Sequence, residues 1–177
     1  MWTRHKTIII AAMTAAPAPV PVDLAGVPPA VHERFMRLAI AKARENPAYP
    51  FGAVIVRATD LTVMASGVNT TRRNPTFHGE MDAINDYVRQ HGNQGWEGLI
   101  LYTTGEPCPM CMGAIAWAGI GGVVFGSSIG TVSREGIRQI EISAASVSRA
   151  ARFYRGSLLG GVLASETHLL FANRTRG

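Results

Sequence analysis

The sequence predicts an α/β domain, a three-layer α-β-α sandwich in which a five-stranded mixed sheet is covered by helices on both faces. Two β-rich stretches, 51–57 and 61–68, are separated by a short turn and predict a hairpin. Segments with helical apolar spacing then alternate with short β-rich segments. About thirty residues precede the last β-rich segment, which is enough for a helical crossover and a parallel final strand pair.

The first expected element is a helix at Ala30–Glu45. Pro28 and Pro29 suit its first turn, because a proline there removes only an amide N–H that has no helical partner. Asn46 and the proline after it end the helix. In chain order we then expect strands at Phe51–Arg57 and Leu61–Val68, a helix at His78–Gln90, a strand at Leu99–Thr103, a helix at Pro109–Ala118, a strand at Val123–Phe125, a helical crossover, a strand near Tyr154–Leu159 and a helix at Leu163–Asn173.

The composition is that of an ordinary globular domain, with 47% hydrophobic and 16% charged residues, and excludes a disordered chain. No apolar run approaches the ~20 residues of a membrane span, so we expect none. The net charge is +5, but the basic residues are scattered and form no stripe with aromatic residues between them. This pattern favours a small-molecule partner and leaves a nucleic-acid partner open.

The N-terminal region, 1–26, is expected to lie outside the domain, which we place at 27–177. A positively charged start precedes a short apolar stretch at 7–16, a pattern typical of an export signal. Pro17 follows the small residues at which such a signal would be cleaved and weighs against that interpretation. The region is therefore expected to be either a tail or an export signal.

The residues that indicate chemistry are concentrated in His78-Gly79-Glu80 and in Pro107-Cys108-Pro109-Met110-Cys111. A C-x-x-C pair alone also fits a disulfide or a redox site. Here the upstream H-x-E and the flanking prolines favour a metal site instead. One imidazole and two thiolates give three ligands for a tetrahedral Zn²⁺ and leave the fourth position for water, as in catalytic zinc sites.

The positions of the candidate ligands on the expected helices support a metal site as strongly as their residue types do. His78 and Cys108 both fall where a helix is expected to begin, and helix N-termini stabilise thiolates. Cys108 and Cys111 are one helical turn apart, so both sulfurs face the same point. Glu80 points along a different vector from His78, which makes it a poor ligand but a well-placed general acid/base. The alternative for Glu80 is a solvated glutamate in the first turn of a helix.

The H-G-E and E-P-C-P-M-C motifs, with P-F-G-A-V-I-V in the hairpin, resemble the guanine deaminase and tRNA adenosine deaminase branch of the cytidine deaminase superfamily. The resemblance covers roughly residues 31–171, and the joint motif is the one described for zinc-dependent nucleobase deaminases. It implies a cytidine-deaminase-like fold, a bound Zn²⁺, hydrolytic deamination that releases ammonia, and a cytoplasmic location unless residues 1–26 act as a signal.

The resemblance also suggests substrate contacts. Phe51 matches the guanine deaminase form, and Asn69 stands where relatives place an asparagine that hydrogen-bonds the base. Gly79, which replaces the usual alanine, is expected to contact the substrate through its backbone, and Thr104 is expected to contact it as well. These residues favour a small purine-like nucleobase or nucleoside. The C-terminus lacks the aromatic residue expected in guanine deaminases, so guanine itself is not singled out.

Several alternatives stay open. Trp117 lies in a segment that packs at the dimer interface of relatives, which implies a homodimer, although a core position fits equally well. Glu135 and Glu141 are candidates for recognition of an amino group, or residues of a solvated helix face. The rival activities are editing of adenosine in tRNA and an inert zinc-binding assembly domain, in which Glu80 would be dispensable.

Overall fold

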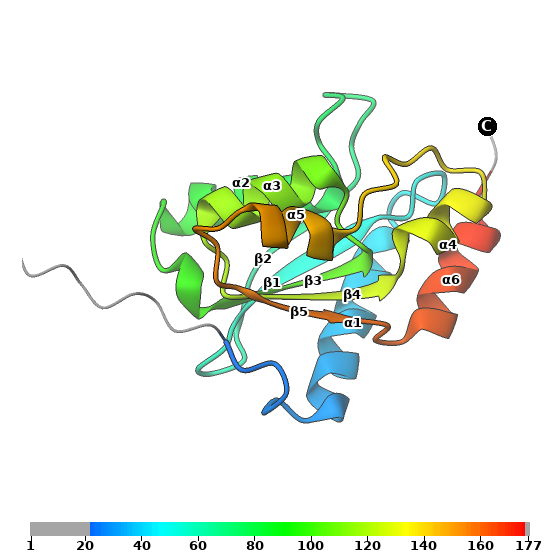
Figure 1. Cartoon of the computed structure of the whole chain (residues 1–177). Coiled ribbons are helices and arrows are strands. Elements are labelled where there is room, and N and C mark those ends of the chain that lie inside the picture. The colour runs from blue at the N-terminus through cyan, green and yellow to red at the C-terminus, as the bar shows by residue number, and fades with distance from the viewer. Residues whose placement is uncertain (1–21, 176–177) are drawn as a thin grey trace, which may run out of the picture.

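The computed structural model describes residues 22–175 and has the predicted three-layer sandwich architecture (Figure 1). None of the helices in this part of the chain is long and apolar enough to cross a membrane. The elements are α1 Pro29–Ala43, β1 Gly52–Arg57, β2 Val63–Val68, α2 Gly79–His91, the 3₁₀ helix η1 Trp96–Gly98, β3 Leu99–Gly105, α3 Pro109–Ala118, β4 Gly122–Ser127, α4 Ile129–Arg134, α5 Ala144–Ala150, β5 Ser157–Gly160 and α6 Ala164–Ala172.

The five strands form one mixed sheet in the order β2-β1-β3-β4-β5. β1 is antiparallel to both β2 and β3, whereas the β3–β4 and β4–β5 pairs are parallel. The hairpin and the parallel final pair expected from the sequence are both confirmed. The parallel half brings the C-terminal ends of β3 and β4 to one edge, and the chain leaves β3 there to enter α3.

Alternate residues of the central strands point into two separate cores. Ala53 and Ile55 of β1 pack in the core beneath α2 and α3, and Val54 and Val56 pack in the core against α1. Both faces of the sheet are thus apolar and covered by helices, which is why the central strands are nearly continuous runs of apolar residues. Helices α2, α3 and α5 lie on one face, and α1 and α6 lie on the other (Figure 1).

The crossover between β4 and β5 contains two short helices, α4 and α5, where the sequence suggested a single helical segment. Ser128 and Ser143 cap them, and each hydroxyl accepts a hydrogen bond from the backbone N–H three residues later. The second hairpin strand starts at Val63 and not at Leu61, because Leu61 has a left-handed backbone conformation with φ 58° and belongs to the turn.

The packed part of the chain begins a few residues before the boundary expected at residue 27. Leu24 is buried in the core against α1, and the backbone N–H of Val22 donates to the carbonyl of Gly121. These contacts attach the segment to the sheet layer. The tail or export signal expected at 1–26 falls mostly on residues 1–21, which lie outside the described residues.

Candidate metal centre and adjoining pocket

The three expected metal ligands meet at the starts of two neighbouring helices. His78 is the N-cap of α2 and Cys108 is the N-cap of α3, with Pro109 as the first helical residue. Cys111 lies one turn into α3 and is buried. The ligand atoms of the three residues all lie within 4.8 Å of one another, so segments thirty residues apart form one cluster.

The spacing and protonation of the cluster fit a tetrahedral metal ion. Cys108 Sγ lies 3.6 Å from His78 Nδ1, and ligand atoms of a tetrahedral zinc are separated by roughly 3.5 Å. The hydrogen bond from the Cys111 thiol, with that from His78, lowers the pKa of Cys108 to about 4. The same thiol–thiolate hydrogen bond and burial raise the pKa of Cys111. A divalent cation at this cluster would bind both cysteines as thiolates, so its binding would release protons.

The other described histidines are held elsewhere. His32 contacts the hydroxyl of Tyr102 and the carbonyl of Leu24, and His91 contacts the carbonyl of Met64. His168 faces Glu135. Within residues 22–175 the cluster thus has three protein ligands, the number typical of a catalytic site with one position left for water.

Glu80 is buried beside the cluster, with 3% of its surface exposed. It is the second residue of α2, and it lines the same pocket as His78 and Cys108. Burial and the negative charge of Cys108 raise the pKa of its carboxyl. A carboxyl with a raised pKa is a stronger base, so at the edge of a pocket it can accept a proton from water and later return it.

The pocket next to the cluster has a volume of about 290 Å³. It is lined by Tyr49, Phe51, Asn69, Thr71, His78, Glu80, Glu106, Cys108, Gly136, Ile137, Arg138, Gln139 and Arg174. Its size is near the lower limit of ordinary small-molecule sites, which are roughly 300–1,000 Å³. The structure therefore brings Phe51 and Asn69 into the same pocket as the candidate metal ligands His78 and Cys108.

The local hydrogen bonds of Asn69 decide what it can offer to a ligand. Its side-chain oxygen accepts from the backbone N–H of Thr71 at 3.3 Å and from the Thr71 hydroxyl at 2.9 Å. Both lone pairs of that oxygen are therefore used within the turn, and only the amide NH₂ remains for the pocket. A group that pairs with Asn69 must accordingly be a hydrogen-bond acceptor, such as a ring nitrogen or a carbonyl oxygen.

Gly79 and Thr104 lie next to the pocket but do not line it with their side chains. A Cβ atom on Gly79 would lie 2.6 Å from the carbonyl oxygen of Phe51, so α2 can begin this close to the start of β1 only with glycine here. The hydroxyl of Thr104 accepts from the N–H of Gly52 and donates to the carbonyl of Pro50. Contact of a substrate with the backbone of Gly79, or with Thr104, stays a prediction.

Three charged pocket residues did not enter the sequence-based site, namely Glu106, Arg138 and Arg174. Glu106 accepts hydrogen bonds from the first N–H groups of α4 and α5, which belong to Ile129 and Ala144. Its place two residues before Cys108 was a signal that could have identified it. Arg174 ends a four-residue stretch, 171–174, that resembles the C-terminal part of bacterial guanine deaminases, and Arg138 lies in the segment 127–152 that was expected to build the pocket wall. The sequence did not single out either arginine.

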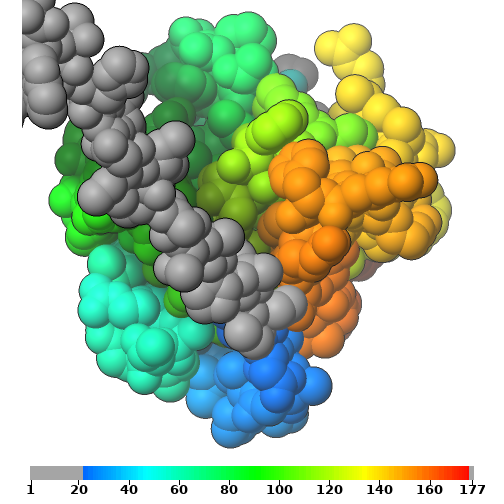
Figure 2. All heavy atoms as spheres, turned by 60° about the vertical axis from the view of Figure 1, so that its left-hand side comes forward, coloured from blue at the N-terminus to red at the C-terminus, as the bar shows by residue number. Residues whose placement is uncertain are grey.

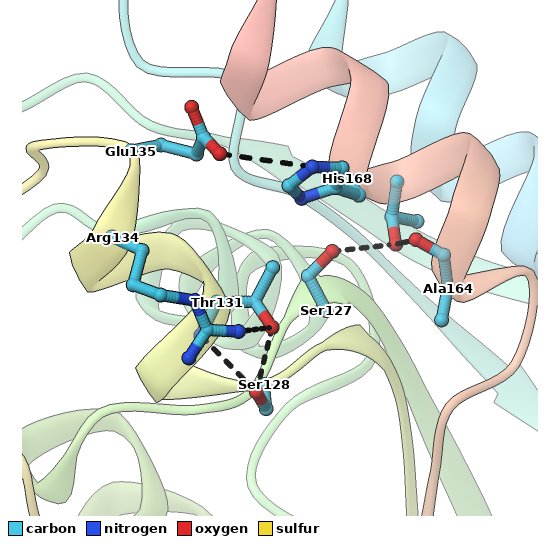
Figure 3. Close-up of polar contacts among 8 residues, drawn as sticks. Ser127, Ser128, Thr131, Arg134, Glu135, Ala164 and His168 are labelled. Carbon is cyan, nitrogen blue, oxygen red and sulfur yellow. Dashed lines mark hydrogen bonds and ion pairs between the residues drawn. The ribbon is translucent and has the colours of Figure 1, made fainter.

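The remaining candidates lie away from the pocket. Glu135 faces His168, as Figure 3 shows, and Glu141 accepts a hydrogen bond from the Ser133 hydroxyl, so neither lines the pocket. Trp117 is 80% exposed and packs against Phe153, which is incompatible with the core position considered above. The exposed position agrees with the alternative interpretation, a contact surface.

The fold and the cluster place this chain among α/β proteins with a candidate metal site at two adjacent helix starts. Residues 29–127, more than half of the chain, match the family described as the cytidine and deoxycytidylate deaminase zinc-binding region, and the chain belongs to this family. The superfamily expected from the motifs is thereby confirmed.

Two curated relatives represent the two branches considered above. Guanine deaminase of Bacillus subtilis is 44% identical over 93 residues, which are 49% of this chain and 58% of that protein. The tRNA-specific adenosine deaminase of Rickettsia felis is 31% identical over 123 residues, which are 68% of this chain and 82% of that protein. The chain spans about three-fifths of the length of the Bacillus subtilis relatives that it matches.

Solved structures show the same fold. A guanine deaminase from Nitrosomonas europaea superposes with a TM-score of 0.69 at 19% identity, covering 83% of this chain and 85% of its own. A structure of a tRNA:A34 deaminase gives a TM-score of 0.65 at 29% identity, covering 77% of this chain and 98% of its own. Both support the cytidine-deaminase-like sandwich.

Proposed function

We propose that this chain is a zinc-dependent hydrolytic deaminase of a small purine-like nucleobase or nucleoside. The observation that carries the proposal is the buried carboxyl of Glu80 beside a cluster of three metal ligands, at the edge of a small pocket. In the reaction, water adds to the ring carbon that bears the amino group. The C–N bond then breaks, ammonia leaves and a carbonyl remains.

His78, Cys108 and Cys111 would hold the zinc. When bound, the ion would lower the pKa of water toward neutrality and so supply hydroxide at physiological pH. Glu80 takes a proton from the water and passes it to the ring nitrogen, and a later proton goes to the departing amine. Its raised pKa suits the first of these steps, because a carboxylate with a raised pKa is a stronger base and takes the proton from water more readily.

The pocket residues orient the base. Asn69 donates its amide N–H to an acceptor on the ring, and Phe51 forms an apolar wall. Phe51 is fixed from behind by Phe171, with the ring centroids 4.9 Å apart. The similarity to Bacillus subtilis guanine deaminase, 44% over the aligned residues, supports a purine-like base.

The test is ammonia release by zinc-loaded protein with guanine, adenine, cytosine, their nucleosides, pterins, triazines and a tRNA anticodon hairpin. Glu80→Gln should retain zinc and lose at least the ~10²–10⁴-fold in turnover that a general acid/base supplies. Glu97→Gln, the same change at an exposed position outside the pocket, should keep full activity. Undiminished turnover by Glu80→Gln would refute the mechanism and favour the inert zinc domain.

The second candidate is deamination of adenosine in tRNA, favoured by the match to tRNA-specific adenosine deaminases and by the net charge of +5. Binding to tRNA would neutralise phosphates, so the affinity should fall steeply with salt. A filter-binding titration of the hairpin that detects no affinity at low salt would remove this candidate. A turnover signal with the hairpin alone would replace the small-molecule proposal.

We also propose that the protein forms a homodimer. The support is the aromatic pair of Trp117 at the end of α3 and Phe153 after α5, both more than half exposed, with ring centroids 4.6 Å apart. Figure 2 shows α3 and α5 side by side on one face of the molecule. An exposed aromatic pair of this size is typical of a surface that is buried by a partner.

A further inference from the structure

Two arginines face the pocket from segments that are far apart in sequence. Arg138 belongs to the segment between α4 and α5, and Arg174 follows the end of α6. Both line the pocket that contains His78 and Glu80. A Cβ atom on Gly136 would lie 4.0 Å from Arg174 Nη2, so the two segments meet at this wall.

The neighbours of both arginines are anchored. Ile137, beside Arg138, is 7% exposed and shares a buried apolar cluster with Phe171, three residues before Arg174. On the other side of Arg174, the N–H of Thr175 donates to the carbonyl of Pro47. These contacts hold the backbone of both arginines at the pocket.

A further link joins the same two segments. Glu135 at the end of α4 faces His168 of α6, with 3.6 Å between the carboxylate Oε1 and the imidazole Nε2, as Figure 3 shows. Ser127 at the end of β4 also exchanges a hydrogen bond with Thr167 of α6. The residues on both sides of α4 are thus connected to α6, the helix that precedes Arg174, at two points.

Neither guanidinium charge has a counter-ion in the described part of the chain. The ion pairs within 4 Å among residues 22–175 include neither Arg138 nor Arg174. The Nε atom of Arg174 is buried and has no hydrogen-bond partner among these residues. The carboxylate of Glu106 in the same pocket already accepts two backbone hydrogen bonds, one on each oxygen.

We propose that Arg138 and Arg174 form a subsite for an anionic group, a phosphate or a carboxylate, carried by the same small molecule whose base lies over Glu80. This inference rests on the proposed function and narrows the substrate class. Guanidinium groups bind both anions through paired, charge-assisted hydrogen bonds. Two arginines in a small pocket, without an ion-pair partner among residues 22–175, select an anionic molecule over a neutral base. The substrate is then a phosphorylated nucleoside or a carboxylated base.

The experiment measures binding by calorimetry to zinc-loaded Glu80→Gln protein, in which turnover should be at least about 10²-fold lower. Two matched pairs serve as probes: guanosine with guanosine 5′-monophosphate, and pterin with pterin-6-carboxylate. The anionic member of at least one pair should bind about tenfold or more tightly, because a charge-assisted hydrogen bond contributes at least that factor. The pair that responds distinguishes a phosphate from a carboxylate.

The same binding measurements on arginine variants show whether the preference for the anionic probe comes from Arg138 and Arg174. Arg138→Gln and Arg174→Gln, each added to Glu80→Gln, should each lower the preference for the anionic member, and the combination should abolish it. Arg152→Gln makes the same charge change at an exposed position outside the pocket and should leave the preference intact. This control separates a local subsite from a general effect of net charge.

Three results would overturn the subsite. The first is equal affinity for both members of each pair, or no measurable binding by either anionic compound. The second is a preference that survives in the double arginine variant. The third is a loss of tRNA hairpin affinity in these variants without any discrimination among the small probes, which would assign the arginines to a polynucleotide backbone. By contrast, an anion preference without ammonia release by the parent enzyme would refute the deaminase proposal and support the subsite.

Discussion

Two glycines of this fold differ in what surrounds them. A Cβ atom on Gly79 would lie 2.6 Å from the Phe51 carbonyl oxygen, whereas a Cβ atom on Gly113, inside α3, would have no contact within 4 Å beyond its own helix backbone. Gly79 stands between His78 and Glu80, so its close approach to β1 sets the depth at which both side chains enter the pocket. Gly79, which lies between the candidate metal ligand His78 and the candidate acid/base Glu80, therefore also determines how closely α2 packs against β1.

We expect Gly79→Ala to lower the free energy of unfolding by about 1–3 kcal/mol, because the added methyl group must displace backbone atoms. Turnover should fall as well, since the start of α2 would shift. Gly113→Ala should instead raise stability by up to about 1 kcal/mol, because alanine is the better helix former. Urea titrations followed by circular dichroism measure both changes. A Gly79→Ala protein as stable and active as the parent would contradict the close approach.

At the scale of elements, a single carboxylate connects the segment before Cys108 to the first residues of α4 and α5. Glu106 lies two residues before Cys108, and its two oxygens accept from Ile129 N and Ala144 N at 2.9 Å each. These amides open α4 and α5, where a negative charge is also favoured by the helix dipoles. Glu106 thus links the first residues of both helices to the segment that leads into Cys108.

Glu106→Gln should raise KM more than it lowers kcat, with zinc content unchanged, because one helix N–H loses its acceptor and the wall moves away from the substrate. The cost in stability should be about 1–3 kcal/mol, the range for an unsatisfied buried amide. Steady-state kinetics and thermal denaturation test both effects. Glu97→Gln is the matched control and should change neither value. Loss of zinc with unaltered KM would instead assign Glu106 to the segment before Cys108 alone.

At the scale of the whole molecule, the two helical layers differ in their exposed surface. The layer of α2, α3 and α5 carries Trp117 and Phe153, whereas the exposed apolar residues of the opposite layer include Leu38 and Leu169. Only the first group, among the described residues, pairs two exposed aromatic rings. The proposed dimer would therefore bury the α3–α5 side and leave α1 and α6 in solvent.

Sedimentation equilibrium should show a dimer for the parent protein. Trp117→Ser should weaken the association at least roughly thirtyfold, since a central interface tryptophan contributes about 2 kcal/mol or more. Leu169→Ser removes an exposed apolar side chain from the other layer and should leave the association unchanged. A monomeric parent, or a Trp117→Ser protein that dimerises like the parent, would disprove the interface.

The sequence by itself determined the hairpin, the mixed sheet, most of the elements and the three residues of the candidate metal site. These features depend on local spacing: apolar periodicity defines each helix and strand, and Cys108 and Cys111 face one point because they are one helical turn apart. The number of helices between β4 and β5 was harder to predict from the sequence. Helices α4 and α5 are so short that their serine N-caps were the main signal.

The tertiary structure alone decided which side chains line the pocket and which of their hydrogen-bonding groups are free to contact a ligand. Thr104 is turned to the backbone of Pro50 and Gly52, and Asn69 uses its oxygen within a turn, which no periodicity reveals. Arg138 and Arg174 share one wall because Ile137 and Phe171 pack together across more than thirty residues of chain. The physical reason is that local spacing specifies where a side chain stands on its own element, whereas long-range packing specifies which elements meet.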